Sequence, residues 1–254
     1  MLAAFLGENL FAFFLVFARL GAALMLLPAI GEVYVFVRAR LALALAVSAI
    51  MTPLLAPHLP TMPESALAMA MLLIGEALMG LFIGSLSRIM ISALHTASMV
   101  IAFQTGLGAA TMFDPNQGDQ GAIIGRFLVV TLLALVFTTE LHHVLLTALA
   151  GSYQTLIPGT LPFVGDFSLV AIRFCSEAFV VAVQIAAPVV LLGLLFYLGL
   201  GVLARLMPAV QIFFIALPLQ IVLGFWIVMV TLSAMMLWYL DYFEHSFTTL
   251  FSAG

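Results

Sequence analysis

Two charge-free apolar runs constrain this chain more than any other feature of its sequence. They extend from Ala178 to Ala204 and from Leu206 to Leu240, whereas a helix needs about 20 apolar residues to cross a bilayer. The chain as a whole has 7% charged residues, against roughly 25% in soluble domains. The sequence therefore predicts an all-α membrane protein.

Charge and cysteine content exclude several classes of function. The formal net charge is −4, with seven arginines and no lysine, so the chain has no polybasic stripe for nucleic acid or for an anionic lipid surface. The single cysteine, Cys175, offers neither an internal disulfide nor a metal-ligand spacing. We expect it to be a packed thiol, and we expect no cofactor.

Hydropathy and the positions of proline, glycine and charge predict about six kinked apolar helices. Their ranges are 10–28, 41–55, 66–98, 123–150, 176–204 and 212–240. The fourth helix carries Glu140, His142 and His143 near its middle, which makes it a poor solitary membrane span. We therefore expect several of these helices to face protein rather than lipid.

Two patterns indicate close packing between helices. The third helix has a stripe of small and charged residues spaced by four, and small residues let another backbone approach closely. This stripe consists of Glu76, Gly80, Gly84 and Arg88. Pro188 and Pro218 lie inside apolar runs, where each removes a helical hydrogen bond and leaves a carbonyl for a neighbour to satisfy.

Arg19 lies inside the first apolar segment. An isolated guanidinium at membrane depth costs several kcal/mol unless it is paired or hydrated. Glu8, Glu76 or another chain is the expected partner. Structural pairing is favoured over a transport role, since transporters usually place more than one such charge around a central site.

Glu140, His142 and His143 form the cluster that comes nearest to a metal or proton-transfer site. On a helix the two histidines diverge by about 100°, whereas a zinc site on one face needs them four residues apart. Polar anchors in a helix contact are the favoured interpretation. The serines lack a nucleophile elbow, so the sequence does not indicate an enzyme.

A polar, glycine-rich loop, QTGLGAATMFDPNQGDQG, interrupts the hydrocarbon from Gln104 to Gly121. Its glycines permit positive φ, and Asp114 with Pro115 initiates a turn, so regular helix is excluded. Met112 and Phe113 at its tip, and the apolar flanks, do not suit a segment that extends far into water. This composition favours a compliant segment that obstructs a passage.

Three blocks of the chain resemble the FliR family of flagellar export-gate proteins, which are related to the SctT subunits of injectisomes. The first block, VIAFQTGLGAATMFDP, contains the family's Gln104, Gly106, Leu107, Asp114 and Pro115. The second block, LHHVLLTALAGSYQTLIPG, departs from the family's Leu-Pro-Ile-Gly order. The third block, AAPVVLLGLLFYLGLGVLARLMPAVQIFFIALPLQIVLG, has Gln and Ile where the family often has Asn or Ser before Phe. Its matching positions are Pro188, Leu200, Gly201, Leu203, Ala204, Arg205, Pro208, Phe213 and Pro218.

The resemblance implies a subunit of the flagellar type III export gate in the bacterial inner membrane, at the basal body. Its partners would be FliP, FliQ, FlhB, FlhA, membrane lipid and unfolded export substrates. Residues 1–175 would form a FliP-like part and residues 176–254 a FliQ-like hairpin of one subunit. The loop would be a channel plug. The plug residues are then Gln104, Gly106, Leu107, Gly108, Met112, Phe113, Asp114 and Pro115.

The remaining residues of interest fall into two groups. Gly80, Gly84, Pro188, Gly201, Arg205, Pro208 and Pro218 are expected to pack helices and support assembly. Arg19, Glu76, Arg88, Glu140, His142 and His143 are expected to be buried charges or polar anchors.

Three alternative functions remain open from the sequence. The first is the homologous SctT subunit of a virulence-type injectisome. The second is a self-contained transporter of small solutes, with Arg19, Glu76 and Glu140 along its pathway. The third is an intramembrane enzyme that uses His142 and His143.

Overall fold

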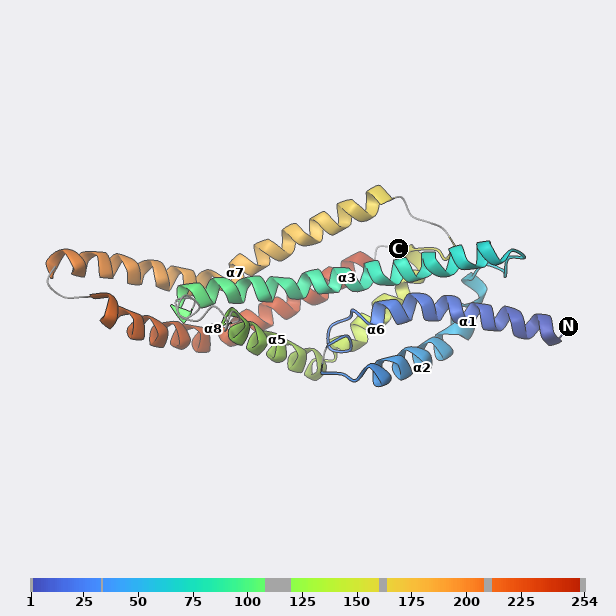
Figure 1. The fold of residues 1–254 in the computed structure, drawn as a ribbon, viewed down its shortest axis with the longest axis horizontal. Coiled ribbons are helices and arrows are strands. Elements are labelled where there is room, and N and C mark those ends of the chain that lie inside the picture. The colour runs from blue at the N-terminus through green and yellow to red at the C-terminus, as the bar shows by residue number, and fades with distance from the viewer. Residues whose placement is uncertain (1, 33, 108–119, 160–163, 208–211, 252–254) are drawn as a thin grey trace. The chain divides into compact units, whose positions relative to one another are not determined.

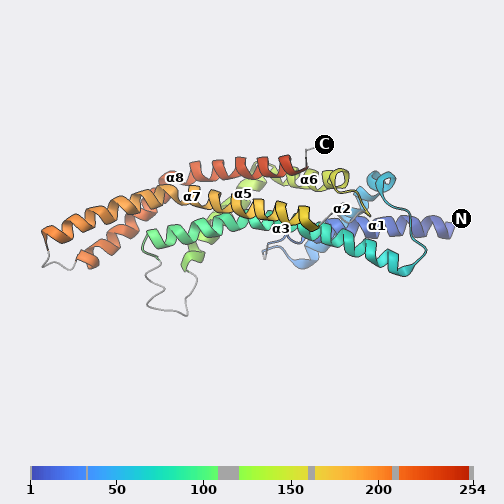
Figure 2. The same ribbon diagram turned by 90° about the horizontal axis from the view of Figure 1, so that it is seen from above.

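The computed structural model describes residues 2–32, 34–107, 120–159, 164–207 and 212–251. The regular elements assigned in these ranges are all helical, as Figures 1 and 2 show, with α1 in blue and α8 in red. They are α1 (Leu2–Leu24), α2 (Val37–Leu55), a short 3₁₀ helix η1 (Ala56–His58), α3 (Ala66–Gln104), α5 (Gln120–Thr138), α6 (Leu141–Thr155), α7 (Val164–Leu206) and α8 (Ile212–Phe251).

Five of the described helices are long and apolar enough to cross a membrane. The α5–α6 pair passes the same test together but is bent by 79°, which makes up to six spans. The predicted fold class, an all-α membrane protein with about six apolar helices, is confirmed.

The boundaries of α3 follow from its sequence. Ser65 caps its start, since the Ser65 hydroxyl oxygen accepts a hydrogen bond of 3.1 Å from the N–H of Ala68. The helix then runs through alanine, leucine and methionine, which have high helix propensity, without a proline. It ends at Gln104, two residues before a glycine.

The predicted fourth helix, residues 123–150, is wrong as a single element. The structure breaks it between Thr138 and Leu141, where Glu140 takes a left-handed backbone conformation with φ of 60°. Two consecutive threonines precede this glutamate, and β-branched residues favour a helix less than leucine or alanine does. The polar residues from Glu140 to His143, which make residues 123–150 a poor solitary membrane span, therefore lie where the helix turns.

The chain forms two compact units that interleave along the sequence. Unit 1 comprises Met1–Met90, Val136–Phe174 and Phe243–Gly254, and unit 2 comprises Ile91–Leu135 and Cys175–Tyr242. These units follow packing within the chain, whereas the division at residues 175 and 176 rests on resemblance to other proteins. That division therefore stays a prediction.

Each unit has its own apolar core. In unit 1, α1 packs against α2 and buries Leu15, Leu20 and Leu24. In unit 2, the second half of α3 buries Leu94 and Ile101. The helices α5, α7 and α8 add further buried residues to unit 2, among them Leu128, Leu132, Ala182, Ile185, Val189 and Met236.

Candidate functional site

The loop indicated by the sequence begins where α3 ends, and the structure describes its first residues. Gly106 turns the backbone with φ of 79°, a left-handed value that favours glycine. Its N–H donates a hydrogen bond of 3.2 Å to the carbonyl oxygen of Phe103, which closes the helix end. Leu107 is half-buried. The other predicted plug residues, Gly108, Met112, Phe113, Asp114 and Pro115, lie outside the described residues.

Within unit 2, side chains of α7 and α8 contact the end of α3. The Nε2 group of Gln220 donates one hydrogen bond of 2.8 Å to the carbonyl oxygen of Gln104 and one of 3.0 Å to the hydroxyl oxygen of Tyr197. A Cβ atom added at Gly193 would lie 2.6 Å from Oε1 of Gln104. One added at Gly224 would lie against the side chain of Thr105. The end of α3 is thus held by a hydrogen-bonded amide and two close contacts with glycine.

Sequence reasoning missed Gln220 and the two glycines. A signal was present, because Gln220 is a polar side chain in a charge-free apolar run and Gly224 follows it by one helical turn on the same face.

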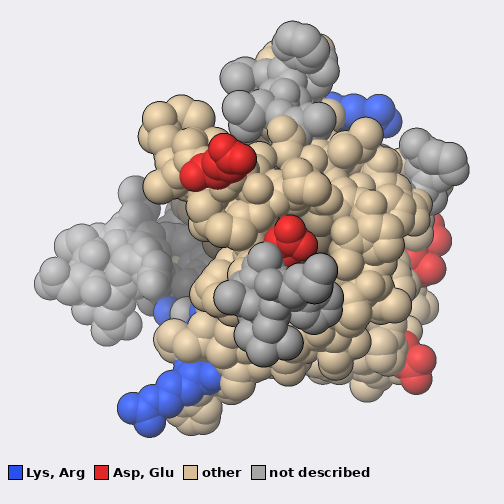
Figure 3. All heavy atoms as spheres, turned by 90° about the vertical axis from the view of Figure 1, so that its right-hand side faces the viewer, with Lys and Arg blue, Asp and Glu red and all other residues tan. Residues whose placement is uncertain are grey.

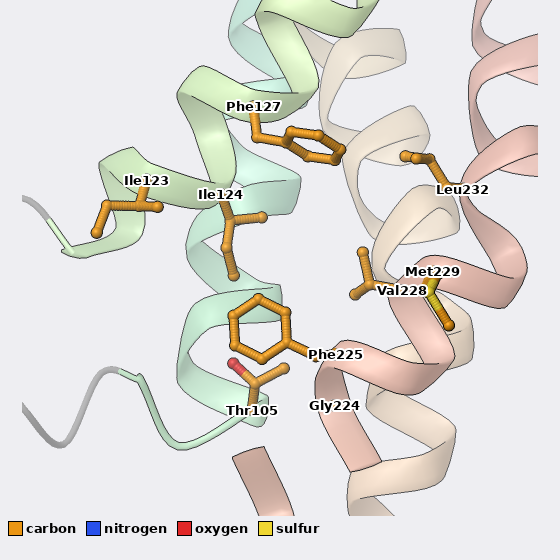
Figure 4. A pocket seen from close by; sticks show the side chains of 9 residues that line it. All are labelled: Thr105, Ile123, Ile124, Phe127, Gly224, Phe225, Val228, Met229 and Leu232. Atoms are coloured by element: carbon orange, nitrogen blue, oxygen red, sulfur yellow. The ribbon is translucent and has the colours of Figure 1, made fainter. Parts of the chain in front are cut away.

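An apolar pocket of about 330 Å³ lies beside the same helix end in unit 2. Figure 4 shows α5 side chains on one side of it and α8 side chains on the other. Its lining residues are Thr105, Ile123, Ile124, Phe127, Gly224, Phe225, Val228, Met229 and Leu232. Thr105 and Gly224 therefore belong both to this pocket and to the contact that holds α3. A pocket with this lining accepts hydrocarbon rather than a polar ligand.

In unit 1 the main polar feature is a buried ion pair. Nε of Arg19 lies 2.6 Å from Oε2 of Glu76, and Nη2 of Arg19 donates to Oε1 of Glu76 at 3.1 Å. The exposed fractions of the two side chains are 0% and 3%. Of the partners that the sequence offers for Arg19, the structure selects Glu76.

The same pair connects α1 and α3 with α6. Nη1 of Arg19 donates to the carbonyl oxygens of Ser152 at 3.2 Å and Leu156 at 2.9 Å, which lie at the C-terminal end of α6. The ring centroid of Tyr153 lies 4.2 Å from Cζ of Arg19, within the range of a cation–π contact. The carboxylate of Glu76 neutralises the guanidinium and the carbonyl groups accept from its Nη1, so it has the surroundings of a structural pair rather than of a solute pathway.

The glycine stripe of α3 contacts α1 and the segment after it. A Cβ atom added at Gly80 would meet the carbonyl oxygen of Arg19, and one added at Gly84 would lie 2.6 Å from Cβ of Leu26. At the end of the stripe, Arg88 donates a hydrogen bond of 2.8 Å to the carbonyl oxygen of Gly31. All four stripe residues, including Glu76, therefore lie on the face of α3 that packs against the N-terminal part of unit 1.

The cluster of Glu140, His142 and His143 lies at the bend between α5 and α6. The side chains of Glu140 and His143 are 79% and 64% exposed, and they lie 3.9 Å apart. Glu140 and His143 are therefore not buried anchors within this chain, because the expected straight helix is broken at Glu140, whereas His142 is half-buried. Among the described residues, no group of three or more His, Cys, Asp or Glu side chains could hold a metal ion.

Other predicted packing positions are open in the isolated chain. Gly201 and Arg205 are exposed near the end of α7, and a Cβ atom added at Gly201 would meet nothing within 4 Å. Pro188 is half-buried and Pro218 is exposed. Cys175 is exposed too, so the expected packed thiol is wrong. Pro208 lies outside the described residues.

Much apolar surface is left uncovered by the chain itself. Only 11% of the Val37–His58 span is buried within the chain. Exposed apolar side chains include Phe36, Leu67, Leu195, Val222 and Met229. On the face drawn in Figure 3, charged side chains stand singly among uncharged ones. Lipid or other protein chains must cover such a surface.

Comparison with known proteins agrees with this architecture. Residues 10–246 match the sequence model of the family described as bacterial export proteins, family 1. A flagellar biosynthetic protein FliR of Caulobacter vibrioides is 37% identical over 226 residues, which cover 88% of this chain and 90% of that relative. The FliR protein of Bacillus subtilis is 32% identical over 225 residues, 87% and 86% of the two chains.

An injectisome relative is also similar. The Yop proteins translocation protein T of Yersinia pestis is 29% identical over 158 residues, which cover 59% of each chain. The family match covers nearly the whole helical part of the chain, and two FliR proteins align over most of their length. This chain therefore belongs to the bacterial export proteins, family 1.

Proposed function

We propose that this chain is a subunit of the flagellar type III protein export gate in the bacterial inner membrane. The observation that carries this function is the family match over residues 10–246, together with 37% identity to a flagellar FliR protein. Five helices among the described residues are long and apolar enough to cross a membrane, which supports the location. Deletion of the gene should abolish flagellar assembly and motility, and a plasmid copy should restore both.

A second candidate function is the corresponding subunit of an injectisome, which the 29% identity to Yop proteins translocation protein T supports. The two systems export different substrates, so one experiment separates them. If the deletion strain keeps its flagella and motility but loses injectisome secretion, the injectisome assignment replaces the flagellar one.

We propose FliP, FliQ, FlhB and FlhA as partners at the basal body, with unfolded polypeptides as substrates. The resemblance supplies these names, and the apolar side chains left exposed on α2, α7 and α8 support the need for partner chains. A tagged chain expressed alone should be unstable, and expression with FliP and FliQ should raise the amount recovered. Equal recovery of a folded chain without them would contradict an obligate gate subunit.

We also propose that the loop from Gln104 to Gly121 is the seal of the export channel. Its support is its composition, the turn at Gly106, and the apolar pocket between α5 and α8 beside its first residues. Irregular backbone at membrane depth persists only where protein or water encloses it. Deletion of residues 110–118 should make cells leak ions while the gate still assembles.

The matched control for this deletion replaces residues 110–118 with a glycine–serine segment of the same length. This variant keeps the chain length and removes Met112 and Phe113. It therefore tests whether the seal requires apolar side chains or only a loop of the same length. Unchanged ion permeability in both variants, with normal gate assembly, would rule out the seal.

The predicted division into a FliP-like part, 1–175, and a FliQ-like hairpin, 176–254, belongs to this proposal. Its support is that α7 and α8 are two long apolar helices in succession. If the division is right, a chimera that carries a FliQ hairpin in place of residues 176–254 should still enter the gate complex. Failure of the chimera to enter, while FliQ itself does, would contradict the division.

A self-contained solute transporter is less well supported by the geometry. Arg19 and Glu76 neutralise each other in a buried pair, and Glu140 is exposed at a bend. A transporter would need charges that a solute can reach near the bilayer midplane. No catalytic step is part of the proposed function.

A further inference from the structure

We propose that Gln220 is a positioning residue that fixes the end of α3, and with it the point from which the loop after Gln104 leaves the helix. The amide of Gln220 bonds the last carbonyl group of α3 and the hydroxyl of Tyr197 on α7. One side chain on α8 thus connects three helices of unit 2. The consequence for channel sealing rests on the proposed function, whereas the positioning role can be measured separately.

The orientation of the Gln220 amide follows from its partners. A backbone carbonyl can only accept, so the group 2.8 Å from the carbonyl oxygen of Gln104 must be the donating nitrogen. The second hydrogen of that nitrogen then points to the Tyr197 hydroxyl oxygen at 3.0 Å. Both donors of the amide are used by groups from other helices.

The end of α3 needs such a donor. The last four carbonyl groups of a helix have no partner inside the helix. In an apolar environment an unsatisfied carbonyl destabilises the fold. Gly106 turns the chain away from the helix axis immediately after Gln104, so the helix cannot continue and satisfy this carbonyl itself. Gln220 supplies from α8 the hydrogen bond that a further helical turn would have supplied.

Close packing supports the same role. Gly193 on α7 leaves room for the Gln104 side chain, and Gly224 on α8 leaves room for Thr105. Gly224 lies one turn beyond Gln220, so a single face of α8 contacts Gln104, the last residue of α3, and Thr105, which follows it. A Cβ atom added at Gly106 would lie 3.4 Å from Cδ of Gln220, which places the loop's first turn directly against this amide.

The test compares Gln220→Leu with Gln184→Leu in the complete gate complex. Gln184 is an exposed glutamine on α7 in the same unit, so it controls for the loss of an amide from the apolar hairpin. Hydrogen exchange of the amides in residues 101–107 is the first readout, and ion leak in whole cells is the second. Residues 83–90, earlier in α3, report whether any change is local.

We expect Gln220→Leu to raise exchange in residues 101–107 by about threefold to tenfold, the range of one ordinary hydrogen bond, without changing residues 83–90. We expect Gln184→Leu to leave both segments unchanged. Ion leak should rise in Gln220→Leu while the gate still assembles. Exchange at the wild-type level in assembled Gln220→Leu complex would overturn the positioning role.

A further variant tests the positioning role even where Gln220→Leu prevents assembly of the gate. If Gln220→Leu does not assemble, Tyr197→Phe removes only the hydroxyl partner, and it should raise exchange in residues 101–107 by about twofold; no rise would contradict the proposal.

The deletion of residues 110–118 separates the seal from the positioning role. If this deletion makes cells leak ions but an assembled Gln220→Leu complex with faster exchange does not, the seal stands and its dependence on Gln220 fails. If the deletion does not leak, the seal itself fails, while the exchange result still decides the positioning role.

Discussion

The two compact units stabilise their interiors with different chemistry. Unit 1 buries a charged pair, Arg19 and Glu76, and surrounds it with carbonyl groups and an aromatic ring. Among the residues described in unit 2, the buried side chains that carry polar groups are neutral, and they include Ser98, Thr105 and Tyr239. The amide of Gln220, which is also neutral, connects its helices.

This difference predicts how much stability each unit should lose when one of these side chains is substituted. Removal of one member of a buried ion pair leaves an uncompensated charge, which destabilises strongly. Loss of a hydrogen bond between uncharged groups lowers the stability by about 1 kcal/mol, and the groups left unsatisfied carry no charge. Loss of one member of the ion pair should therefore destabilise unit 1 more than loss of one hydrogen bond destabilises unit 2.

The largest effect is expected from Arg19→Met. The buried carboxylate of Glu76 then loses its counter-charge, and we expect a loss of about 3–5 kcal/mol of stability. The double variant Arg19→Met with Glu76→Met should recover part of this loss, because it removes both charges. Thermal unfolding of the purified gate complex measures both effects, with Arg38→Met, an exposed arginine of unit 1, as control. If the double variant were less stable than Arg19→Met, the unpaired charge of Glu76 would not be the cause of the loss.

The next effect is expected from Gly80→Ala. The added methyl group would meet the carbonyl oxygen of Arg19, and overpacking of this kind costs about 1–3 kcal/mol. Alanine has the higher helix propensity, so a loss of stability can only come from the contact.

The matched control is Gly201→Ala, where a Cβ atom meets nothing within 4 Å. It should leave the stability of the chain unchanged or slightly raised. If Gly201→Ala instead blocks co-purification with FliP and FliQ, the exposed end of α7 contacts a partner chain.

In unit 2, Gly224→Ala should have a smaller effect than Gly80→Ala. The nearest neighbour of the added methyl group is the Thr105 side chain, which can move more easily than a backbone carbonyl. We expect a loss of about 1–2 kcal/mol. Thr105→Ser, which removes the methyl group of Thr105, should relieve part of it. Thermal unfolding measures both losses. If Gly224→Ala lost as much stability as Gly80→Ala, unit 2 would be as sensitive to an added methyl group as unit 1.

The smallest effect is expected from Glu32→Gln. Oε1 of Glu32 lies 3.4 Å from Nη1 of Arg88, but Arg88 is 40% exposed. Partly exposed ion pairs contribute about 0–1 kcal/mol and are screened by salt. The thermal midpoints of wild type and variant should converge at high salt. A loss close to that of Arg19→Met would show that this pair, too, is essential to unit 1.

Much of unit 1 could be predicted from the sequence because its signals are periodic. The spacing by four from Glu76 to Arg88 indicated one helix face, and the structure places that face against α1. A lone arginine in an apolar helix required a partner, and the candidate partners included Glu76. Periodicity and the cost of burying charge were sufficient for these inferences.

Other features could not be predicted because they depend on tertiary contacts. The break at Glu140 has no proline or glycine to signal it, and a glutamate in left-handed conformation is uncommon. Cys175 was expected to be packed because cysteine is often buried, yet its helix presents it on the exposed side. The apolar run of α8 marks Gln220 as unusual, but its partner depends on where α3 ends, which the sequence of α8 does not contain.

The interleaving of the two units also constrains how the protein can be made. The chain passes from one unit to the other four times, and each crossing falls inside a helix rather than in a loop. The crossings follow Met90 in α3, Leu135 in α5, Phe174 in α7 and Tyr242 in α8. During synthesis, unit 2 is complete only after Tyr242, and unit 1 only after the segment that starts at Phe243. Neither unit can mature on a ribosome before almost the whole chain has been translated, and neither can be exchanged between relatives by a single crossover in the gene.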